Sequence, residues 1–450
     1  MEIKKILILI YMCCQSFMYA QFGPVQYIDN DSDSGDTSYI TTADINNDAL
    51  LDVLVSKAYA ADNITIYFNE GNGSFDQQII AVESDPIYVD ARDINGDGAK
   101  DLLLMTQSNG DLILRMNNNG SFVTRTVIDT ESTFGKGLVI DDFDNDGDQD
   151  IVAIWQHAIN YYENDGTGTF SKTAILTTSG SPNILECWTI TKADVNADGN
   201  MDIVTGETIG AVVYLNNGNG NFTPHTVTQT NHTTITSLAL EEIDGDNLLD
   251  LIFTSATGDA SLYLNNNNTG TSFTHHSDLF SATPNSIKRL AVIEVNNDGL
   301  KDIYTAFSGN PRVFIQGNNS DFSQEIILDN NSSLFVDNVA VADIDNQSDK
   351  EFIWCSPANT IAYQKSTSLK MDQKDNNRVE TYPNPMEQHL YFSHLEDDVR
   401  LKVYDISAKL LIETDLQPNQ ALDVTHLKAG LYFIKLFSNT VQQTLKVQKR

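Results

Sequence analysis

The chain is 450 residues long, enough for roughly two or three ordinary domains or for one large repeat array with a smaller domain. It has 62 Asp and Glu against 27 Lys and Arg, so its formal net charge at pH 7 is −35 and its pI is near 4.3. Nucleic-acid phosphates and anionic membrane surfaces both attract Lys and Arg. The charge therefore argues against either as a partner.

The N-terminal residues have the pattern of an export signal. Lys4 and Lys5 precede an apolar run at 6–12, and Ala20 stands at a plausible cleavage point. The run is too short for a permanent membrane span, and no other stretch is long and apolar enough to cross a bilayer. A lipidated Cys at position 13 or 14 is the weaker alternative, because Met12 is not the small residue expected before it. We predict a signal peptide over residues 1–20 and a secreted or cell-surface protein without a transmembrane segment.

Only Cys187 and Cys355 remain after removal of that signal. Export to an oxidising compartment permits disulfides. The two residues fall at different phases of the repeat described below, so we predict two separate buried thiols and keep a bridge as the alternative.

The most informative stretch is residues 142–150, Asp-Phe-Asp-Asn-Asp-Gly-Asp-Gln-Asp. Carboxylates at its positions 1, 3, 5 and 9 repel one another unless the loop turns their oxygens inward around one divalent cation. Ca²⁺ suits such a site because it accepts six to eight oxygen ligands at flexible geometry, including a backbone carbonyl at position 7. Gly147 at position 6 fits a turn with positive φ.

This nine-residue pattern occurs seven times at a spacing of 48 to 52 residues, a period typical of a propeller or a solenoid. The seventh copy departs with Gln347, Ser348 and Glu351 at positions 5, 6 and 9, so we predict no metal there. In the other copies we expect Ca²⁺ to stabilise the fold rather than to take part in catalysis. The predicted ligands are Asp44, Asn46, Asp48 and Asp52; Asp93, Asn95, Asp97 and Asp101; Asp142, Asp144, Asp146 and Asp150; Asp194, Asn196, Asp198 and Asp202; Glu242, Asp244, Asp246 and Asp250; and Glu294, Asn296, Asp298 and Asp302.

Strand patterns surround every loop. The residue four positions before the first ligand is always apolar, and a short apolar run follows position 9, as in residues 53–55 and 203–204. A third apolar strand leads into an Asn/Gly-rich turn, and a Phe after the turn opens a fourth strand. Four short antiparallel strands per copy make one propeller blade.

The seventh copy ends near Tyr363 without a turn-and-Phe strand. The missing strand is present at the mature N-terminus, where residues 22–28 read Phe-Gly-Pro-Val-Gln-Tyr-Ile. We infer that this segment pairs with the last blade and closes the ring, which removes two open sheet edges. The sequence therefore predicts an all-β fold with a seven-bladed β-propeller over residues 21–366. Even spacing alone would also fit a solenoid.

The loops resemble the FG-GAP/VCBS repeats, the calcium-loop propellers of integrin α-subunits and of many exported bacterial proteins. The resemblance rests on the Asp-x-Asn/Asp-x-Asp-Gly-x-x-Asp core, and it covers about three quarters of the chain. It implies a Ca²⁺-binding propeller. It is specific for the fold and not for a function.

Residues 367–378 are polar and charged without an apolar period, which predicts a linker. From 379 to 450 the acidic loops stop, and short alternating strands predict a small Ig-like β-sandwich. This part resembles the C-terminal sorting domain of the type IX secretion pathway, through Tyr-Pro-Asn-Pro at 382–385, residues 403–409 and 427–432, and the basic end at 446–450. The resemblance implies passage across the outer membrane by the type IX secretion machinery, with removal of the domain. An ordinary binding sandwich is the alternative.

No Gly-x-Ser-x-Gly, His-Glu-x-x-His or phosphate-binding glycine pattern is present in the sequence. The propeller histidines fall at different repeat phases, which favours solvated surface side chains. We therefore expect a binding or adhesion module for a glycan or an extracellular protein, and not an enzyme. The alternatives are a secreted carbohydrate-active enzyme of the polysaccharide-lyase type, with Lys288 and Arg289 as the candidate basic pair, and a purely structural extracellular protein.

The face away from the acidic loops is the better candidate for binding. Positions five residues before each first ligand should line the mouth of the central channel, where aromatic and amide groups suit a sugar. Arg289 would suit an acidic sugar. Trp155 and Trp188 either belong to this face or fill gaps between blades. The seven mouth positions are Tyr39, Tyr88, Gly137, Thr189, Ser237, Arg289 and Asn338.

Overall fold

The structure, a computed structural model, describes residues 21–30, 36–58, 62–82, 84–131, 133–177, 186–208, 210–227, 234–257, 259–281, 287–296, 298–307, 311–317, 320–328, 338–347, 350–356, 360–367, 381–382, 388–392, 399–405, 409–417, 420–437 and 442–449. The predicted signal peptide, nearly all of the predicted linker and residues 383–385 of the Tyr-Pro-Asn-Pro segment lie outside the described residues. The chain forms two compact units, Met1–Leu369 and Lys370–Arg450.

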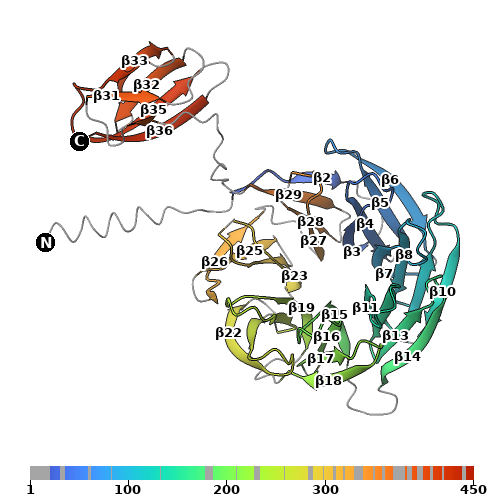
Figure 1. The fold of residues 1–450 in the computed structure, drawn as a ribbon. Coiled ribbons are helices and arrows are strands. Elements are labelled where there is room, and N and C mark those ends of the chain that lie inside the picture. The colour runs from blue at the N-terminus through green and yellow to red at the C-terminus, as the bar shows by residue number, and fades with distance from the viewer. Residues whose placement is uncertain are drawn as a thin grey trace. The chain divides into compact units, whose positions relative to one another are not determined.

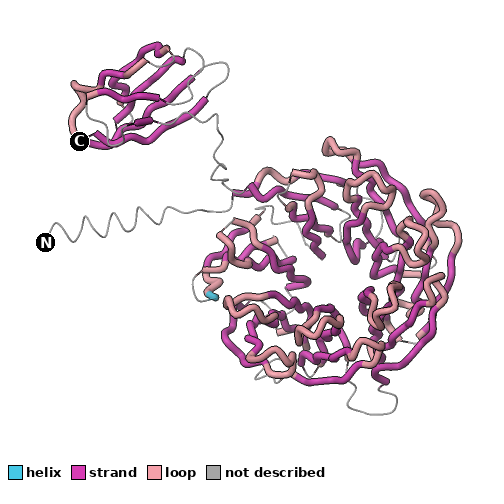
Figure 2. The backbone as a smooth tube through the Cα atoms, viewed as in Figure 1, coloured by secondary structure: helices cyan, strands magenta, loops and turns pink. Residues whose placement is uncertain are grey.

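Apart from a single 3₁₀ residue at Ser320, the described parts of both units consist of strands and loops (Figure 2), so the predicted all-β class is confirmed. Among these residues no helix has the length and apolar content needed to cross a membrane.

The strands described in the first unit form seven antiparallel sheets, which we number 1 to 7 after the repeat that contributes most of each. The sheets follow one another around a common centre, with the first strand of each sheet innermost (Figure 1). Sheets 1 to 3 consist of β3 (Asp36–Ala43), β4 (Asp52–Ala58), β5 (Asn63–Asn69) and β6 (Phe75–Ala81); β7 (Pro86–Arg92), β8 (Asp101–Thr106), β9 (Asp111–Arg115) and β10 (Arg125–Thr130); and β11 (Gly135–Asp141), β12 (Asp150–Trp155), β13 (Ala158–Asn164) and β14 (Phe170–Thr177).

The other sheets repeat this order. Sheets 4 to 6 consist of β15 (Cys187–Ala193), β16 (Asp202–Glu207), β17 (Gly210–Asn216) and β18 (Phe222–Thr226); β19 (Ile235–Glu241), β20 (Asp250–Ser255), β21 (Asp259–Asn265) and β22 (Phe273–Ser281); and β23 (Ile287–Ile293), β24 (Asp302–Phe307), β25 (Arg312–Ile315) and β26 (Gln324–Ile327). Sheet 7 contains β27 (Asn338–Ala342), β28 (Glu351–Cys355) and β29 (Ile361–Thr367), together with β1 (Gln21–Phe22) and β2 (Gln26–Asp29).

The burial of each strand follows from its place in the sheet. The second strands, such as β8 and β12, are buried at every residue because neighbouring sheets cover both of their faces. The outermost strands, such as β6, consist mostly of exposed and partly buried residues. The apolar runs after position 9 are therefore the doubly buried strands that the sequence predicts.

The apolar core lies between adjacent sheets. Each neighbouring pair of sheets shares a cluster of buried side chains in the described residues, and sheets 7 and 1 share one as well. Between sheets 3 and 4, for example, Val152 and Ile154 pack with Ile203 and Val212. Removal of this apolar surface from water favours the packed ring of sheets, and no sheet has a complete core of its own.

The N-terminal segment completes sheet 7. Both β1 and β2 pair antiparallel with β29, with Gln26 opposite Tyr363. The Tyr363 hydroxyl donates to Gln26 Oε1 at 2.6 Å, and Gln364 Nε2 donates to the carbonyl of Gly23 at 2.6 Å. The predicted pairing of the two chain ends of the repeat region is confirmed.

The two cysteines are buried, and no disulfide joins them. Cys187 lies in the core between sheets 3 and 4, and Cys355 lies in the core between sheets 7 and 1. Burial raises the pKa of the Cys187 thiol, which keeps it protonated. The prediction of two separate buried thiols is confirmed.

The second unit has its own core. In its described residues, Leu401, Val403, Ile434 and Leu436 are fully buried and pack together. Two sheets enclose this core: β30 (Thr381–Tyr382), β31 (His389–Phe392) and β34 (Leu422–Asp423), and β33 (Leu410–Leu416), β32 (Val399–Asp405), β35 (Gly430–Phe437) and β36 (Gln442–Lys449).

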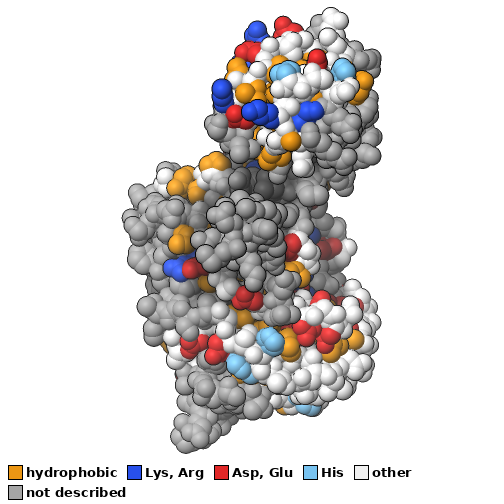
Figure 3. Space-filling view, turned by 90° about the vertical axis from the view of Figure 1, so that its left-hand side faces the viewer, with side chains coloured by type: hydrophobic (Ala, Val, Ile, Leu, Met, Phe, Trp, Pro, Cys, Tyr) orange, Lys and Arg blue, Asp and Glu red, His pale blue; other side chains and the backbone are white. Residues whose placement is uncertain are grey.

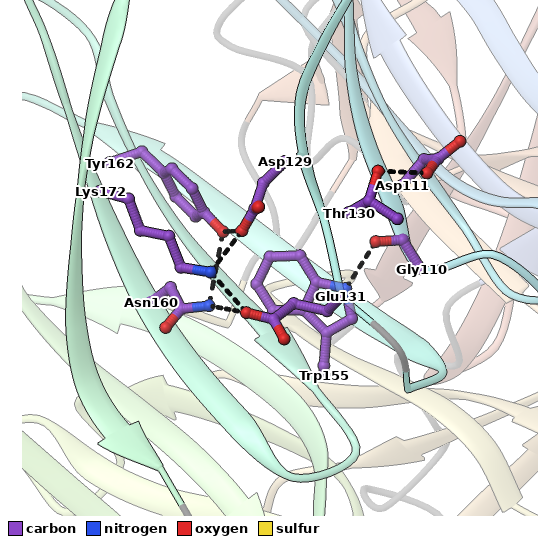
Figure 4. A network of polar contacts seen from close by, with 9 residues as sticks. All are labelled: Gly110, Asp111, Asp129, Thr130, Glu131, Trp155, Asn160, Tyr162 and Lys172. Atoms are coloured by element: carbon purple, nitrogen blue, oxygen red, sulfur yellow. Dashed lines mark hydrogen bonds and ion pairs between the residues drawn. The ribbon is translucent and has the colours of Figure 1, made fainter.

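A polar network joins sheets 2 and 3 near their outer strands (Figure 4). Lys172 on β14 forms ion pairs with Asp129 at 2.6 Å and with Glu131 at 2.5 Å. Tyr162 donates to Asp129 at 2.6 Å, and Asn160 donates to Glu131 at 3.0 Å. Burial favours a higher pKa for Asp129, but the hydrogen bonds from Lys172 and Tyr162 outweigh burial and lower that pKa.

Replacing Lys172 tests this network. We expect Lys172→Met to lower the free energy of unfolding at pH 7 by about 0.5–1 kcal/mol, because a partly exposed ion pair is screened by water. Since the folded-state pKa of Asp129 is lowered, its contribution is present above the unfolded-state pKa of about 3.9 and is lost as pH falls through the folded-state pKa. Urea unfolding should show a difference that shrinks towards low pH. Lys350→Met, at an exposed residue, is the control, and a pH-independent difference would contradict the assignment.

Candidate metal centres and central cavity

The acidic loops connect the first and second strands of each sheet. In repeat 3, Asp142 accepts hydrogen bonds from the N–H groups of Asp146 and Gly147, both at 3.0 Å. Asp144 accepts a further bond from the Asp146 N–H at 3.2 Å, and Asp146 accepts one from Asp148 at 2.9 Å. These bonds fold the side chains of positions 1, 3 and 5 into the loop. The same pair of bonds to position 1 is made by Asp44, Asp93 and Asp194.

Two loop positions adopt positive φ. In repeat 3 they are Asn145 at position 4, with φ 64°, and Gly147 at position 6, with φ 100°. The expectation for position 6 holds even in repeat 1, where Ala49 has φ 70°. Sequence reasoning did not single out position 4, although the Asn and Gly residues common there favour a left-handed backbone.

In repeats 3 and 5, positions 1, 3 and 5 are all acidic and their side chains converge. In each group one carboxylate oxygen per residue lies within 4.8 Å of the others. Burial, and then the charge of Asp146, raise the pKa of Asp144. Converging carboxylate oxygens are the donors that a hard divalent cation takes. The groups are Asp142, Asp144 and Asp146, and Glu242, Asp244 and Asp246.

Repeats 1, 2, 4 and 6 have Asn at position 3. Its amide nitrogen donates to the carboxylate at position 5, which lowers the repulsion inside these loops. The carboxylates of repeats 3 and 5, which lack this hydrogen bond, therefore gain more from a bound cation.

On the face drawn in Figure 3 the acidic side chains of the first unit form separate groups and no single patch. The Asn residues at position 3 hydrogen-bond within their own loops. The donating pairs are Asn46 and Asp48, Asn95 and Asp97, Asn196 and Asp198, and Asn296 and Asp298, at 2.9–3.0 Å.

The carboxylate at position 9 is buried and bound to the backbone. Asp150 accepts hydrogen bonds from the N–H groups of Phe143 at 3.1 Å and Asn164 at 2.8 Å, and from the Tyr161 hydroxyl at 2.8 Å. Burial nevertheless raises the pKa of Asp150 to about 6. Coordination by position 9 stays a prediction, because Asp150 lies outside the converging group of its repeat. The same two backbone bonds are made by Asp52, Asp101, Asp202, Asp250 and Asp302.

An Asn or Gln after or at the end of the third strand links neighbouring loops, and we call its side chain the bridging amide. Asn164 Nδ2 donates to the carbonyl of Gln149 at 3.1 Å and to that of Ile94, in the loop of sheet 2, at 2.8 Å. The motif analysis did not identify this residue, although it precedes every Asn/Gly-rich turn. The other bridging amides that reach the preceding loop are Asn69 to Ile344, Asn117 to Ile45, Asn216 to Phe143 and Gln316 to Ile243.

Repeat 7 differs from the others. Asp343, Asp345 and Glu351 also bring carboxylate oxygens within 4.8 Å of one another. However, Lys365 on β29 forms an ion pair with Asp345. The ammonium group supplies positive charge that a metal ion would supply elsewhere. The absence of a metal from this repeat stays a prediction, because its carboxylates also converge.

A cavity of about 320 Å³ opens at the centre of the ring. Its lining includes five of the predicted mouth residues, Tyr39, Tyr88, Gly137, Thr189 and Arg289. The side chains of the other two predicted mouth residues bind backbone: Ser237 Oγ accepts the N–H of Leu290, and Asn338 Nδ2 donates to the carbonyl of Ser38.

The two tryptophans have different surroundings. Trp155 is completely buried, and its Nε1 donates to the carbonyl of Gly110 at 3.0 Å, which fits the gap-filling interpretation. The Trp188 ring is half-buried, and the Lys136 ammonium lies 4.0 Å from its centre.

Replacing a bridging amide tests the link between sheets. We expect Asn164→Ala to cost about 2–4 kcal/mol of unfolding free energy, because two buried carbonyls lose their donor. Chemical unfolding measures the loss. The exposed Asn72, changed to Ala, is the matched control and should cost under about 0.5 kcal/mol. Equal effects of the two substitutions would contradict the proposed link.

Two family models match the chain. The FG-GAP-like repeat matches residues 44–104, 93–153, 142–205 and 242–305, together about half of the chain. The secretion system C-terminal sorting domain matches residues 380–450. No curated protein matches the chain.

Solved structures with the same fold have low sequence identity to this chain. The structure of BBS1N in complex with ARL6DN is 13% identical, has a TM-score of 0.52 and covers 76% of this chain and 97% of its own. A lectin from Agrocybe aegerita that recognises non-reducing terminal N-acetylglucosamine is 17% identical, has a TM-score of 0.50 and covers 74% of this chain and 85% of its own.

The two family matches indicate different properties of the chain. The sorting domain directs export through the type IX system to the cell surface or the medium, which implies contact with that secretion machinery. The acidic loops and four-stranded sheets are those of the repeat family. The chain therefore belongs to the FG-GAP-like repeat family and carries a type IX sorting domain at its C-terminus.

Proposed function

We propose that this protein is a calcium-stabilised, seven-bladed β-propeller that acts outside the cell as a glycan-binding module. The observation that carries the proposal is the central cavity, which combines a pair of tyrosines, threonine hydroxyls and charged groups. A sugar site needs such a mixture, because aromatic faces cover C–H groups while polar side chains bind hydroxyls.

Several contacts support a closed ring of seven blades. Pairing of β1 and β2 with β29 leaves no gap in sheet 7. Sheets 7 and 1 share a core, and the bridging amide of Asn69 donates to Ile344 in sheet 7. In the second unit, two sheets enclose one apolar core, which supports an Ig-like sandwich for the sorting domain.

The donor set of the loops supports Ca²⁺. Positions 1, 3 and 5 offer carboxylate and amide oxygens, and no described His or Cys joins the converging groups. Ca²⁺ accepts such ligands at flexible geometry, whereas Mg²⁺ prefers a tight octahedral shell with bound water. The net charge of −35 also gives a divalent cation a large electrostatic gain.

Removing calcium should destabilise the protein. At a Ca²⁺ concentration of about 100 Kd, one site adds roughly 2.7 kcal/mol, so we expect a chelator to lower Tm by about 5 °C or more. Titration calorimetry of Asp142→Asn should show about one site fewer than wild type. Asp76→Asn, at an exposed residue outside the loops, should leave the number of sites unchanged. An unchanged Tm in chelator would remove the calcium proposal.

The binding proposal leaves two alternatives. A polysaccharide lyase would need a base beside a basic group, and a structural matrix protein would need no cavity. The Agrocybe aegerita lectin, which recognises terminal N-acetylglucosamine, is an example of a sugar-recognising protein with this fold. We favour binding over catalysis, since the cavity lining contains none of the described histidines of the first unit. His225, His275 and His276 lie on outermost strands, and His157 lies in the turn between β12 and β13.

A glycan array at millimolar Ca²⁺ tests the function. We expect retention of a subset of glycans without cleavage, because the cavity has groups for recognition and no assigned nucleophile. Unsaturated products that absorb in the ultraviolet would establish a lyase instead. Retention of proteins but of no glycan would replace the glycan with a protein partner.

A further inference from the structure

The central cavity concentrates positive charge in an acidic protein. Residues 21–366 contain 14 Lys and Arg, and four of these line the cavity. They come from sheets 2, 3, 4 and 6, so only the closed ring brings them together. The four residues are Arg92, Lys136, Lys192 and Arg289.

Two of these cations are neutralised by neighbours. Arg92 forms an ion pair with Asp90 at 3.2 Å. Lys192 forms an ion pair with Asp141 and donates to the carbonyl of Ile140. Both Arg92 and Lys192 lie at or near the ends of β7 and β15 that lead into acidic loops.

The other two cations have no carboxylate within ion-pair distance among the described residues. Lys136 lies near the start of β11, with its ammonium over the Trp188 ring. Arg289 lies near the start of β23, and its polar contact is with the Thr189 hydroxyl, 3.5 Å from Nη1. These strand starts face away from the acidic loops, at the cavity mouth. An anion that reaches the mouth therefore meets two cations that have no carboxylate in ion-pair contact among the described residues, although the charge of Glu186 acts on Lys136 from a greater distance.

The chemical environment favours an anion over water. Burial lowers the pKa of Lys136, which shows that its ammonium has lost part of its hydration. A bound carboxylate or sulfate would replace that hydration with charge-assisted hydrogen bonds. Arg289 offers a planar fork of donors that fits either group.

A tyrosine pair stands beside these cations. The rings of Tyr39 and Tyr88 have centroids 4.2 Å apart and come from the innermost strands of sheets 1 and 2. Burial raises the pKa of both tyrosine hydroxyls, and the positive charge of Arg289 partly opposes that rise. Arg289 therefore lies near both hydroxyls. The aromatic surface and the anion-binding groups thus belong to one site.

We propose that the cavity binds an acidic sugar residue, with its carboxylate or sulfate between Lys136 and Arg289 and its ring against the Tyr39–Tyr88 pair. The volume of about 320 Å³ matches the lower end of small-ligand sites and suits one sugar residue. This inference rests on the proposed glycan-binding function and adds the chemical class of the glycan.

Titration calorimetry of the full chain in millimolar Ca²⁺ tests the inference with three oligosaccharides of matched length: a uronate, a sulfated galactan and a neutral galactan. We expect at least one acidic ligand to bind about tenfold or more tightly than the neutral one. The ligand that binds distinguishes carboxylate from sulfate. Arg289→Gln and Lys136→Gln should each weaken that binding about tenfold, whereas the exposed Lys350→Gln should change it less than about twofold.

Thermal unfolding should show each variant folded, with Tm within about 2 °C of wild type. Equal affinity for acidic and neutral ligands, or no effect of either cavity variant, would overturn the inference. Gly137→Leu separates this failure from that of the proposed function. A Cβ added at Gly137 lies 3.5 Å from Ile190, so the backbone accommodates it while the side chain narrows the cavity. If wild type binds acidic and neutral ligands equally and Gly137→Leu abolishes binding of both, the glycan function stands and the anionic class falls. If wild type binds none of the three, both fall.

Discussion

A buried carboxylate at position 9 of each acidic loop organises the first unit. In repeat 3, Asp150 holds the start of the loop through Phe143 and the end of the third strand through Asn164. Ionised carboxylates are costly to bury, and charge-assisted bonds from backbone N–H groups offset part of that cost. The remaining cost is visible in the pKa of about 6 for Asp150 and about 7 for Asp302. A cation at the neighbouring positions would favour the ionised form further.

In the described residues, bridging amides extend this local arrangement across five of the seven junctions between neighbouring sheets. Asn164 is placed by its own backbone bond to Asp150, and its side chain then binds Ile94 in the preceding loop. Each loop is thereby tied to its own sheet and to a neighbour. The innermost strand connects the loop to the cavity. Tyr88 and Arg92, which line the cavity, lie on β7, and β7 leads directly into the loop at Asp93. The acidic loops and the cavity are therefore parts of one structure.

Most of this fold could be predicted from the repeats, because each acidic loop is shaped by hydrogen bonds between residues close together in the sequence. Loop residues at positions 1, 3 and 5 fold onto each other through bonds within a few residues, so their pattern is visible in the sequence. Position 9 was visible as a recurring Asp, but its two backbone bonds join segments 7 and 14 residues away in repeat 3. Of the two cavity charges at the mouth, Arg289 was predicted from its repeat position, whereas Lys136 was not. Lys136 and Arg289 lie far apart in the chain, and only closure of the ring places both at one mouth.

Sheet 7 brings a lysine side chain to its acidic loop. It is assembled from both ends of the repeat region, and its loop has lost the Asp of position 5. Lys365, on the strand that also pairs with β1 and β2, places its ammonium against Asp345 instead. A tethered ammonium cannot dissociate when calcium falls, whereas bound Ca²⁺ can. If the other loops bind Ca²⁺ as proposed, this ion pair would keep the charge balance of the closing sheet when calcium falls.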